Sequence, residues 1–136
     1  MKQRAFTLIE MMAVVVIIGI LAAVIGPKIF KNVEETQRTR AHQDIENLKK
    51  SITLFRFNTN KLPEELRDLV KEPDGVRGWK GPYMERLPKD PWENSYEYRV
   101  PGNDGRDFDI WSLGPDGREG GEGNDADITS WVEDDE

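Results

Sequence analysis

The chain has 136 residues, enough for one small domain, with 19 Lys and Arg against 26 Asp and Glu and a net charge of -7. It has no cysteine, which excludes disulfides, thiolate metal sites and a cysteine nucleophile, and its one histidine excludes a multi-histidine metal site within the chain. The acidity also argues against a nucleic-acid-binding protein, because neutralising phosphates requires a basic face. Most of the acidity lies at one end, since residues 102–136 hold 12 acidic and 2 basic side chains.

The N-terminus combines a short basic stretch, residues 1–5, with an apolar run over residues 6–25 that is interrupted only by Thr7 and Glu10. Twenty helical residues span about 30 Å, the thickness of the hydrocarbon core of a bilayer. The basic residues before the run predict a cytoplasmic N-terminus, with the polar remainder on the far side of the membrane. A cleaved secretory signal is the competing interpretation, although its apolar region is usually only about 7–15 residues long.

Glu10 is the one acidic residue inside the apolar run, where a carboxylate is costly and indicates a functional role with a partner. No basic residue within the run can pair with it. We therefore expect its partner to come from another chain or from a new amino terminus, such as the one that cleavage before Phe6 would create. The alternative is that the side chain only extends to the membrane interface.

The stretch Phe6-Thr7-Leu8-Ile9-Glu10, with its basic leader and the apolar run, resembles the start of mature type IV pilins and pseudopilins. The resemblance implies that a prepilin peptidase cuts between Ala5 and Phe6 and methylates Phe6. It also implies that Glu10 neutralises the amino terminus of a neighbouring subunit during assembly. The family normally has glycine where this chain has Ala5.

Pro27, which follows Gly26, marks the end of the apolar run. A proline inside a helix removes one hydrogen bond and clashes with the preceding turn, so the pair predicts a kink, a melted segment or a helix end. The resemblance favours a helix that continues and gives Pro27 a part in assembly, because pilins carry a proline at this place. We expect a leader over residues 1–5, a transmembrane half of the helix over 6–27 and an amphipathic half over 28–57.

An apolar stripe at alternating spacings of four and three residues supports this amphipathic half. Its members are Ala41, Ile45, Leu48, Ile52 and Phe55. A joined helix from residue 6 to 57 would be nearly 80 Å long, at about 1.5 Å per residue. A small head cannot cover that length, so the N-terminal half must contact lipid or other copies of the chain, which favours a filament subunit.

Residues 58–136 are expected to form a globular head. Turn residues end the long helix, residues 64–70 suit a short helix, and alternation over 95–100 and 108–113 predicts an antiparallel hairpin that packs on the amphipathic helix.

An enzyme is the alternative from another functional class, with Asp107 and Asp109 as its paired carboxylates. Alternation places both on one strand face, which we expect to face solvent, and the sequence offers no nucleophile with a base. It also has no phosphate-binding GxxxxGK[ST] motif. We therefore expect no catalytic activity.

Two motifs in the head, Leu87-Pro88-Lys89-Asp90-Pro91-Trp92 and Ser112-Leu113-Gly114-Pro115-Asp116-Gly117, resemble the major pseudopilins of type II secretion systems. The resemblance implies an α+β, pilin-like fold, in which a long N-terminal helix packs on a small antiparallel sheet. It implies a subunit that polymerises into a periplasmic pseudopilus and supports export of folded proteins across the outer membrane. A type IV pilin for adhesion, motility or DNA uptake is the alternative, but the disulfide that many pilins carry cannot form here.

The same resemblance implies a location and a set of partners. The chain would cross the inner membrane once, with its N-terminus in the cytoplasm and its head in the periplasm. Its partners would be its own copies, minor pseudopilins, the inner-membrane assembly platform, the prepilin peptidase and membrane lipid, with no nucleic acid.

The glycine-rich loop over residues 114–127 carries five carboxylates, which repel one another unless a cation binds. Ca²⁺ accepts 6–8 oxygen ligands in flexible geometry, whereas Mg²⁺ takes fewer protein ligands and keeps its water. The EF-hand pattern does not fit, because Arg118 and Gly120 occupy positions that need side-chain oxygens. The residues alone leave open a calcium loop or a solvated acidic loop.

The resemblance to major pseudopilins implies that the loop binds Ca²⁺. Its expected ligands are the side chains of Asp116 and Asp127 and the carbonyl of Leu113, followed by Asp125 and the carbonyl of Arg118. The last four residues, 133–136, are expected to form a solvated acidic tail.

Overall fold

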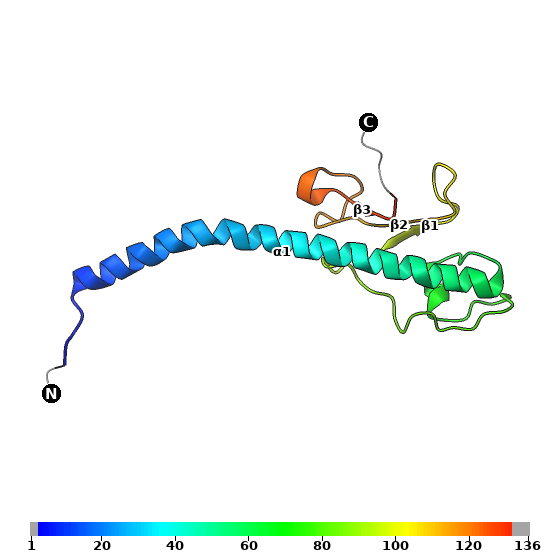
Figure 1. The fold of residues 1–136 in the computed structure, drawn as a ribbon, viewed down its shortest axis with the longest axis horizontal. Coiled ribbons are helices and arrows are strands. Elements are labelled where there is room, and N and C mark those ends of the chain that lie inside the picture. Colours follow the sequence, from blue (N-terminus) through cyan, green and yellow to red (C-terminus); the bar gives the residue numbers. More distant parts are fainter. Residues whose placement is uncertain (1–2, 132–136) are drawn as a thin grey trace. The chain divides into compact units, whose positions relative to one another are not determined.

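The structure is a computed structural model that describes residues 3–131, so the expected acidic tail lies outside the described residues. One long helix, three short strands and two short 3-10 helices make up its elements (Figure 1). Their bounds are α1 Leu8–Thr59, η1 Leu66–Leu69, β1 Glu97–Arg99, β2 Asp109–Ser112, η2 Gly123–Asp125 and β3 Ile128–Thr129. The chain divides into two units, the first ending at Thr36 and the second beginning at Gln37.

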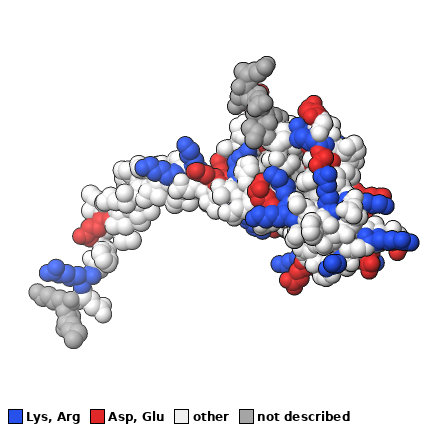
Figure 2. All heavy atoms as spheres, turned by 45° about the vertical axis from the view of Figure 1, so that its right-hand side comes forward, with Lys and Arg blue, Asp and Glu red and all other residues white. Residues whose placement is uncertain are grey.

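The described part of the first unit consists of residues 3–7, which have no regular structure, and the part of α1 from Leu8 to Thr36. α1 runs without interruption through Pro27, so the helix is continuous here, the form that the resemblance favours. Large apolar side chains are exposed around this part of the helix from Leu8 to Val33. On the face in Figure 2, the stretch leading to the N-terminus is white over most of its length.

A helix that is apolar all round needs a nonaqueous environment, because water cannot solvate it favourably on any side. Among the described residues, α1 is the one helix whose length and composition are sufficient to span a membrane, and the apolar window that qualifies it is not buried inside the molecule. The first unit therefore requires lipid or protein around it.

The second unit is built on the remaining part of α1, whose predicted apolar stripe is confirmed as the core. The five stripe residues are at most 1% exposed. They form one cluster with side chains from η1 and the three-stranded region, namely Leu66, Leu69, Tyr96, Ile110 and Ile128. The strands lie on one side of the cyan-to-green part of α1 (Figure 1).

The three strands form one antiparallel sheet in the order β1-β2-β3. Tyr98 pairs with Ile110 in the predicted hairpin, which is confirmed. β3 pairs Ile128 with Ser112 and was not predicted, because two residues are too short to show alternation. The hydroxyl of Tyr96 donates to Asp44 on α1 at 2.9 Å and joins the sheet to the helix. Burial and this carboxylate raise the pKa of Tyr96, so the phenol stays protonated and keeps donating.

Asp90 organises the motif Leu87–Trp92. Its side chain is 1% exposed and accepts hydrogen bonds from the amides of Trp92 and Asn94, while its second oxygen accepts from the Ser112 hydroxyl at 2.7 Å. The two motifs that carry the resemblance to major pseudopilins are thus joined by a buried hydrogen bond between Asp90 and Ser112.

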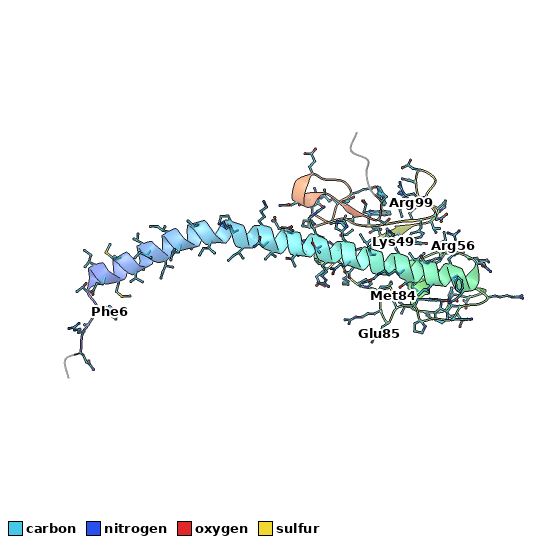
Figure 3. The ribbon with its side chains drawn as sticks, viewed as in Figure 1. Phe6, Lys49, Arg56, Met84, Glu85 and Arg99 are labelled. Carbon is cyan, nitrogen blue, oxygen red and sulfur yellow. The ribbon has the colours of Figure 1, made fainter. Side chains whose placement is uncertain are left out.

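The expectation that Asp107 and Asp109 share a solvent-facing surface is wrong for Asp109. Asp107 is exposed and pairs with Arg56 at 2.6 Å, but Asp109 is 0% exposed. Arg99 and Arg106 each contact Asp109 at 2.6 Å, and the Asn103 amide donates to it at 2.9 Å. The alternation of apolar and polar residues could not reveal the burial of Asp109, because it depends on Arg99 and Arg106, which the folded hairpin places against the carboxylate. Arg99 comes from the hairpin itself, and Arg56 comes from α1 (Figure 3).

Two indole rings cover the arginines that hold Asp109. Arg99 lies 5.1 Å from the ring centre of Trp111, and Arg106 lies 4.8 Å from that of Trp131. Burial would raise the pKa of Asp109, but hydrogen bonds from Arg106, the Asn103 amide and Arg99 outweigh it and lower the pKa from 3.8 to about 2. The carboxylate is therefore a charged structural anchor of the hairpin.

We expect Asp109→Asn to lower the free energy of unfolding at pH 7 by about 3 kcal/mol, the low end of the cost of removing one partner of a buried ion pair, because the side chains of Arg99 and Arg106 are 37% and 31% exposed and water can partly solvate them. The folded pKa lies below the unfolded value, so the carboxylate stabilises the fold above about pH 4, and this contribution is lost as the pH falls through about 2. Denaturant unfolding of the full chain in detergent at a series of pH values measures both effects.

The matched control for this test is Asp107→Asn, which removes an ion pair whose two side chains are both more than half exposed. Such pairs contribute at most about 1 kcal/mol. An Asp109→Asn chain as stable as the Asp107→Asn chain at pH 7 would contradict the anchoring role.

Candidate functional site

The predicted cleavage position lies in residues 3–7, the segment without regular structure before α1. Ala5 and Phe6 are both exposed, Phe6 by 80%, and neither belongs to the helix (Figure 3). The bond between them is therefore not protected by regular structure, as cleavage requires.

Glu10 has a hydrogen-bond partner within its own chain, whereas the expected charged partner from another subunit or a new amino terminus stays a prediction. One Glu10 oxygen accepts from the amide of Thr7 at 2.7 Å and from the Thr7 hydroxyl at 3.0 Å. In return, the Thr7 hydroxyl oxygen accepts from the amide of Glu10 at 3.3 Å. This reciprocal arrangement is a capping box, which satisfies amides that have no partner at a helix start.

The pattern Thr-x-x-Glu at Thr7 and Glu10 is the sequence signature of a capping box, which was not among the predictions for Glu10. The capping box does not exclude a partner from another subunit. It provides an arrangement that an isolated chain can adopt, in which the Glu10 carboxylate fixes the start of α1. The assembly roles of Glu10 and Pro27 stay predictions.

We expect Thr7→Val to fray the first turn of α1, because it removes the hydroxyl from the capping box at a cost of about 1 kcal/mol. Hydrogen exchange at the amides of Glu10 and Met11 should quicken by about fivefold in the full chain in detergent.

Thr36→Val is the matched control for Thr7→Val, because the Thr36 hydroxyl bonds the Asn32 carbonyl within the helix and caps nothing. Equal protection of the first turn in wild type and Thr7→Val would show that the capping box does not hold it.

In the acidic loop, two of the expected ligands already contact backbone amides. Asp116 accepts from the amide of Arg118 at 3.1 Å, and one oxygen of Asp127 accepts from the amide of Gly120 at 3.0 Å. The other Asp127 oxygen, Oδ1, is buried and has no hydrogen-bond partner. A buried carboxylate oxygen without a donor is costly, and a cation would satisfy it.

The structure places the predicted set, Leu113, Asp116, Arg118, Asp125 and Asp127, on one loop between β2 and β3. Within the part of the chain that the structure describes, no group of three or more Asp, Glu, His or Cys side chains could hold a metal. The three carboxylates of the set therefore do not form one cluster, and a site here needs backbone carbonyls as well. The ligand set stays a prediction.

Arg38 contacts this loop, and sequence reasoning did not connect the two. Its Nη1 donates to the carbonyl oxygens of Asn124 at 3.3 Å and Ala126 at 2.9 Å. These residues are separated by 86 and 88 positions from Arg38, so no local pattern could have revealed the contact.

Two sequence models of known families match the chain. The family described as "Type II secretion system (T2SS), protein G" matches residues 28–131, and the one described as "Prokaryotic N-terminal methylation motif" matches residues 1–26.

Curated proteins and a solved structure are also similar to this chain. Type II secretion system core protein G of Pseudomonas aeruginosa is 42% identical over 137 residues, covering 96% of this chain and 96% of that protein. The protein of the same description from Vibrio cholerae is 42% identical over 136 residues, covering 96% and 92%. The crystal structure of the major pseudopilin from the type 2 secretion system of enterohaemorrhagic Escherichia coli has a TM-score of 0.65 at 32% identity, covering 74% of this chain and 87% of that one.

Proposed function

This chain belongs to the type II secretion system protein G family, and we propose that it acts as a structural subunit of a pseudopilus in type II secretion. The observation that carries this function is the family match over residues 28–131, which includes nearly the whole second unit. A structural role also agrees with the family, whose solved relative is described as a major pseudopilin.

The exposed apolar part of α1 supports assembly into a filament. A single copy leaves its large side chains from Leu8 to Val33 exposed, whereas the described residues of the second unit expose only Leu54, Phe57 and Leu87 among their large apolar side chains. Lipid can cover such a helix before assembly, and the same helix of other copies can replace the lipid within a filament.

We further propose the location and partners that the sequence resemblance implies. The apolar part of α1 spans the inner membrane, with the N-terminus in the cytoplasm and the second unit in the periplasm, as the basic residues before the run favour. A prepilin peptidase acts at Ala5 and Phe6, and minor pseudopilins and the assembly platform are partners of assembly. Glu10 then pairs with the amino terminus of a neighbouring subunit.

A strain that lacks this chain should fail to release its type II substrates, and the wild-type chain should restore release. Glu10→Ala should not restore it, because the subunit loses the carboxylate that pairs with its neighbour. Release of a folded substrate into the medium is the measurement, with Glu72→Ala, an exposed carboxylate of the second unit, as the control.

Intact secretion with loss of surface fibres in the deletion strain would instead favour a type IV pilin. Full secretion with Glu10→Ala would overturn the pairing role while leaving the subunit's place in secretion intact.

We also propose that the acidic loop binds Ca²⁺. The expected ligands are Asp116, Asp127 and the carbonyl of Leu113, with Asp125 and the carbonyl of Arg118. The buried, unpartnered Oδ1 of Asp127 fits this role, because it is an oxygen that needs a cation or a donor. A bound cation would neutralise carboxylates that otherwise repel one another and would join the two ends of the loop.

Ca²⁺ at about 100 times its dissociation constant should stabilise the full chain in detergent by about 2.7 kcal/mol and raise its Tm by on the order of 10 °C. Asp116→Ala should abolish this gain, whereas Glu119→Gln, an exposed carboxylate of the same loop outside the expected set, should keep it. A thermal unfolding curve that is the same in Ca²⁺ and in EDTA would contradict the calcium site.

A further inference from the structure

Arg38 is a cation that the described structure places against the acidic loop, yet it does not neutralise the loop's carboxylates. Its guanidinium group donates to the two carbonyl oxygens of Asn124 and Ala126, at 3.3 and 2.9 Å. These carbonyls lie on either side of Asp125, and Ala126 directly precedes Asp127. The contact therefore fixes the backbone that carries two expected ligands.

The oxygens that Arg38 binds are neutral, so its charge does not satisfy the Asp127 carboxylate. Asp127 Oδ1 is still buried without a partner while Arg38 is in place. A cation bound by this oxygen would therefore use a different oxygen from the two that Arg38 contacts.

Two glycines of the loop also lie close to the same backbone. A Cβ atom at Gly121 would lie 2.5 Å from the carbonyl oxygen of Asp125, and one at Gly114 would lie 3.2 Å from that of Ala126. Gly121 also has a φ of +96°, which side chains other than glycine rarely allow. The backbone of residues 124–126 is therefore contacted both by these glycines and by Arg38.

We propose that Arg38 is a positioning residue for the cation site. It holds residues 124–126 so that Asp127 presents its unpartnered oxygen, and it joins the loop to α1. The inference rests on the proposed Ca²⁺ site. Because coupling between two contacts is reciprocal, bound Ca²⁺ also stabilises the contact of Arg38 with the loop.

If Arg38 positions the cation site, replacing it should weaken Ca²⁺ binding by the folded chain, whatever its effect on the stability of the chain without Ca²⁺. Substitution of residues that orient metal ligands typically weakens metal binding by about 10–100-fold. We expect about tenfold weaker binding of Ca²⁺ in Arg38→Gln, and an intermediate loss in Arg38→Lys, because one ammonium group cannot reproduce the geometry of a guanidinium group.

The test is calorimetric titration of the full chain in detergent with CaCl₂, paired with the Tm of each variant in EDTA. Arg40→Gln is the matched control, since Arg40 lies two residues further along α1 and pairs only loosely with Asp44, at 4.0 Å. Its dissociation constant for Ca²⁺ should equal that of wild type.

A purely structural contact would lower the Tm in EDTA and leave the Ca²⁺ affinity of the folded chain unchanged, and that result would overturn the inference. If Arg38→Gln does not fold, Arg38→Lys decides by the same criterion. Wild-type chain that takes up no Ca²⁺ would overturn the proposed site and this inference together. Wild-type affinity in a folded Arg38 variant would overturn this inference alone.

Discussion

The burial of one stripe of α1 is the interaction on which the second unit depends. The three strands have only three, four and two residues, which is too little sheet to form a core alone. Their buried apolar side chains, Ile110 and Ile128, join the same cluster as the helix stripe. The helix is therefore the main apolar surface of the unit, and the loops and strands are organised around it.

A fold with so little regular sheet must satisfy its backbone groups in other ways, and buried carboxylates do this. Asp90 accepts hydrogen bonds from two loop amides. Asp109 accepts one from the Asn103 amide, in addition to its contacts with two arginines. Gly102 belongs to this arrangement, because a Cβ atom there would lie 2.8 Å from an oxygen of Asp109. The conformations of the hairpin turn and of the loop before it are thus fixed by the carboxylates of Asp90 and Asp109. Burying these charges is unfavourable unless they have hydrogen-bond or ion-pair partners.

Periodicity explains which parts of this fold the sequence could predict. The stripe from Ala41 to Phe55 and the paired strands have regular spacings, so both were predicted correctly. The burial of Asp109, the strand β3 and the contact of Arg38 depend on residues far apart in the chain or on too few residues to form a pattern. The capping box of Thr7 and Glu10 differs from these, because its two residues are only three positions apart and their pattern is visible in the sequence.

The two parts of α1 have different roles: the part in the second unit packs in the core, whereas the part in the first unit leaves its apolar surface free for assembly. In the second unit the apolar face is already filled, as the buried stripe shows. In the first unit the large apolar side chains are exposed, and the capping box of Thr7 and Glu10 satisfies the start of α1 without a second copy. A pseudopilin subunit must exist alone before it joins a filament. Because the surface used for folding contains none of the residues left for assembly, the chain can complete its head first and keep its apolar helix for lipid and then for other subunits.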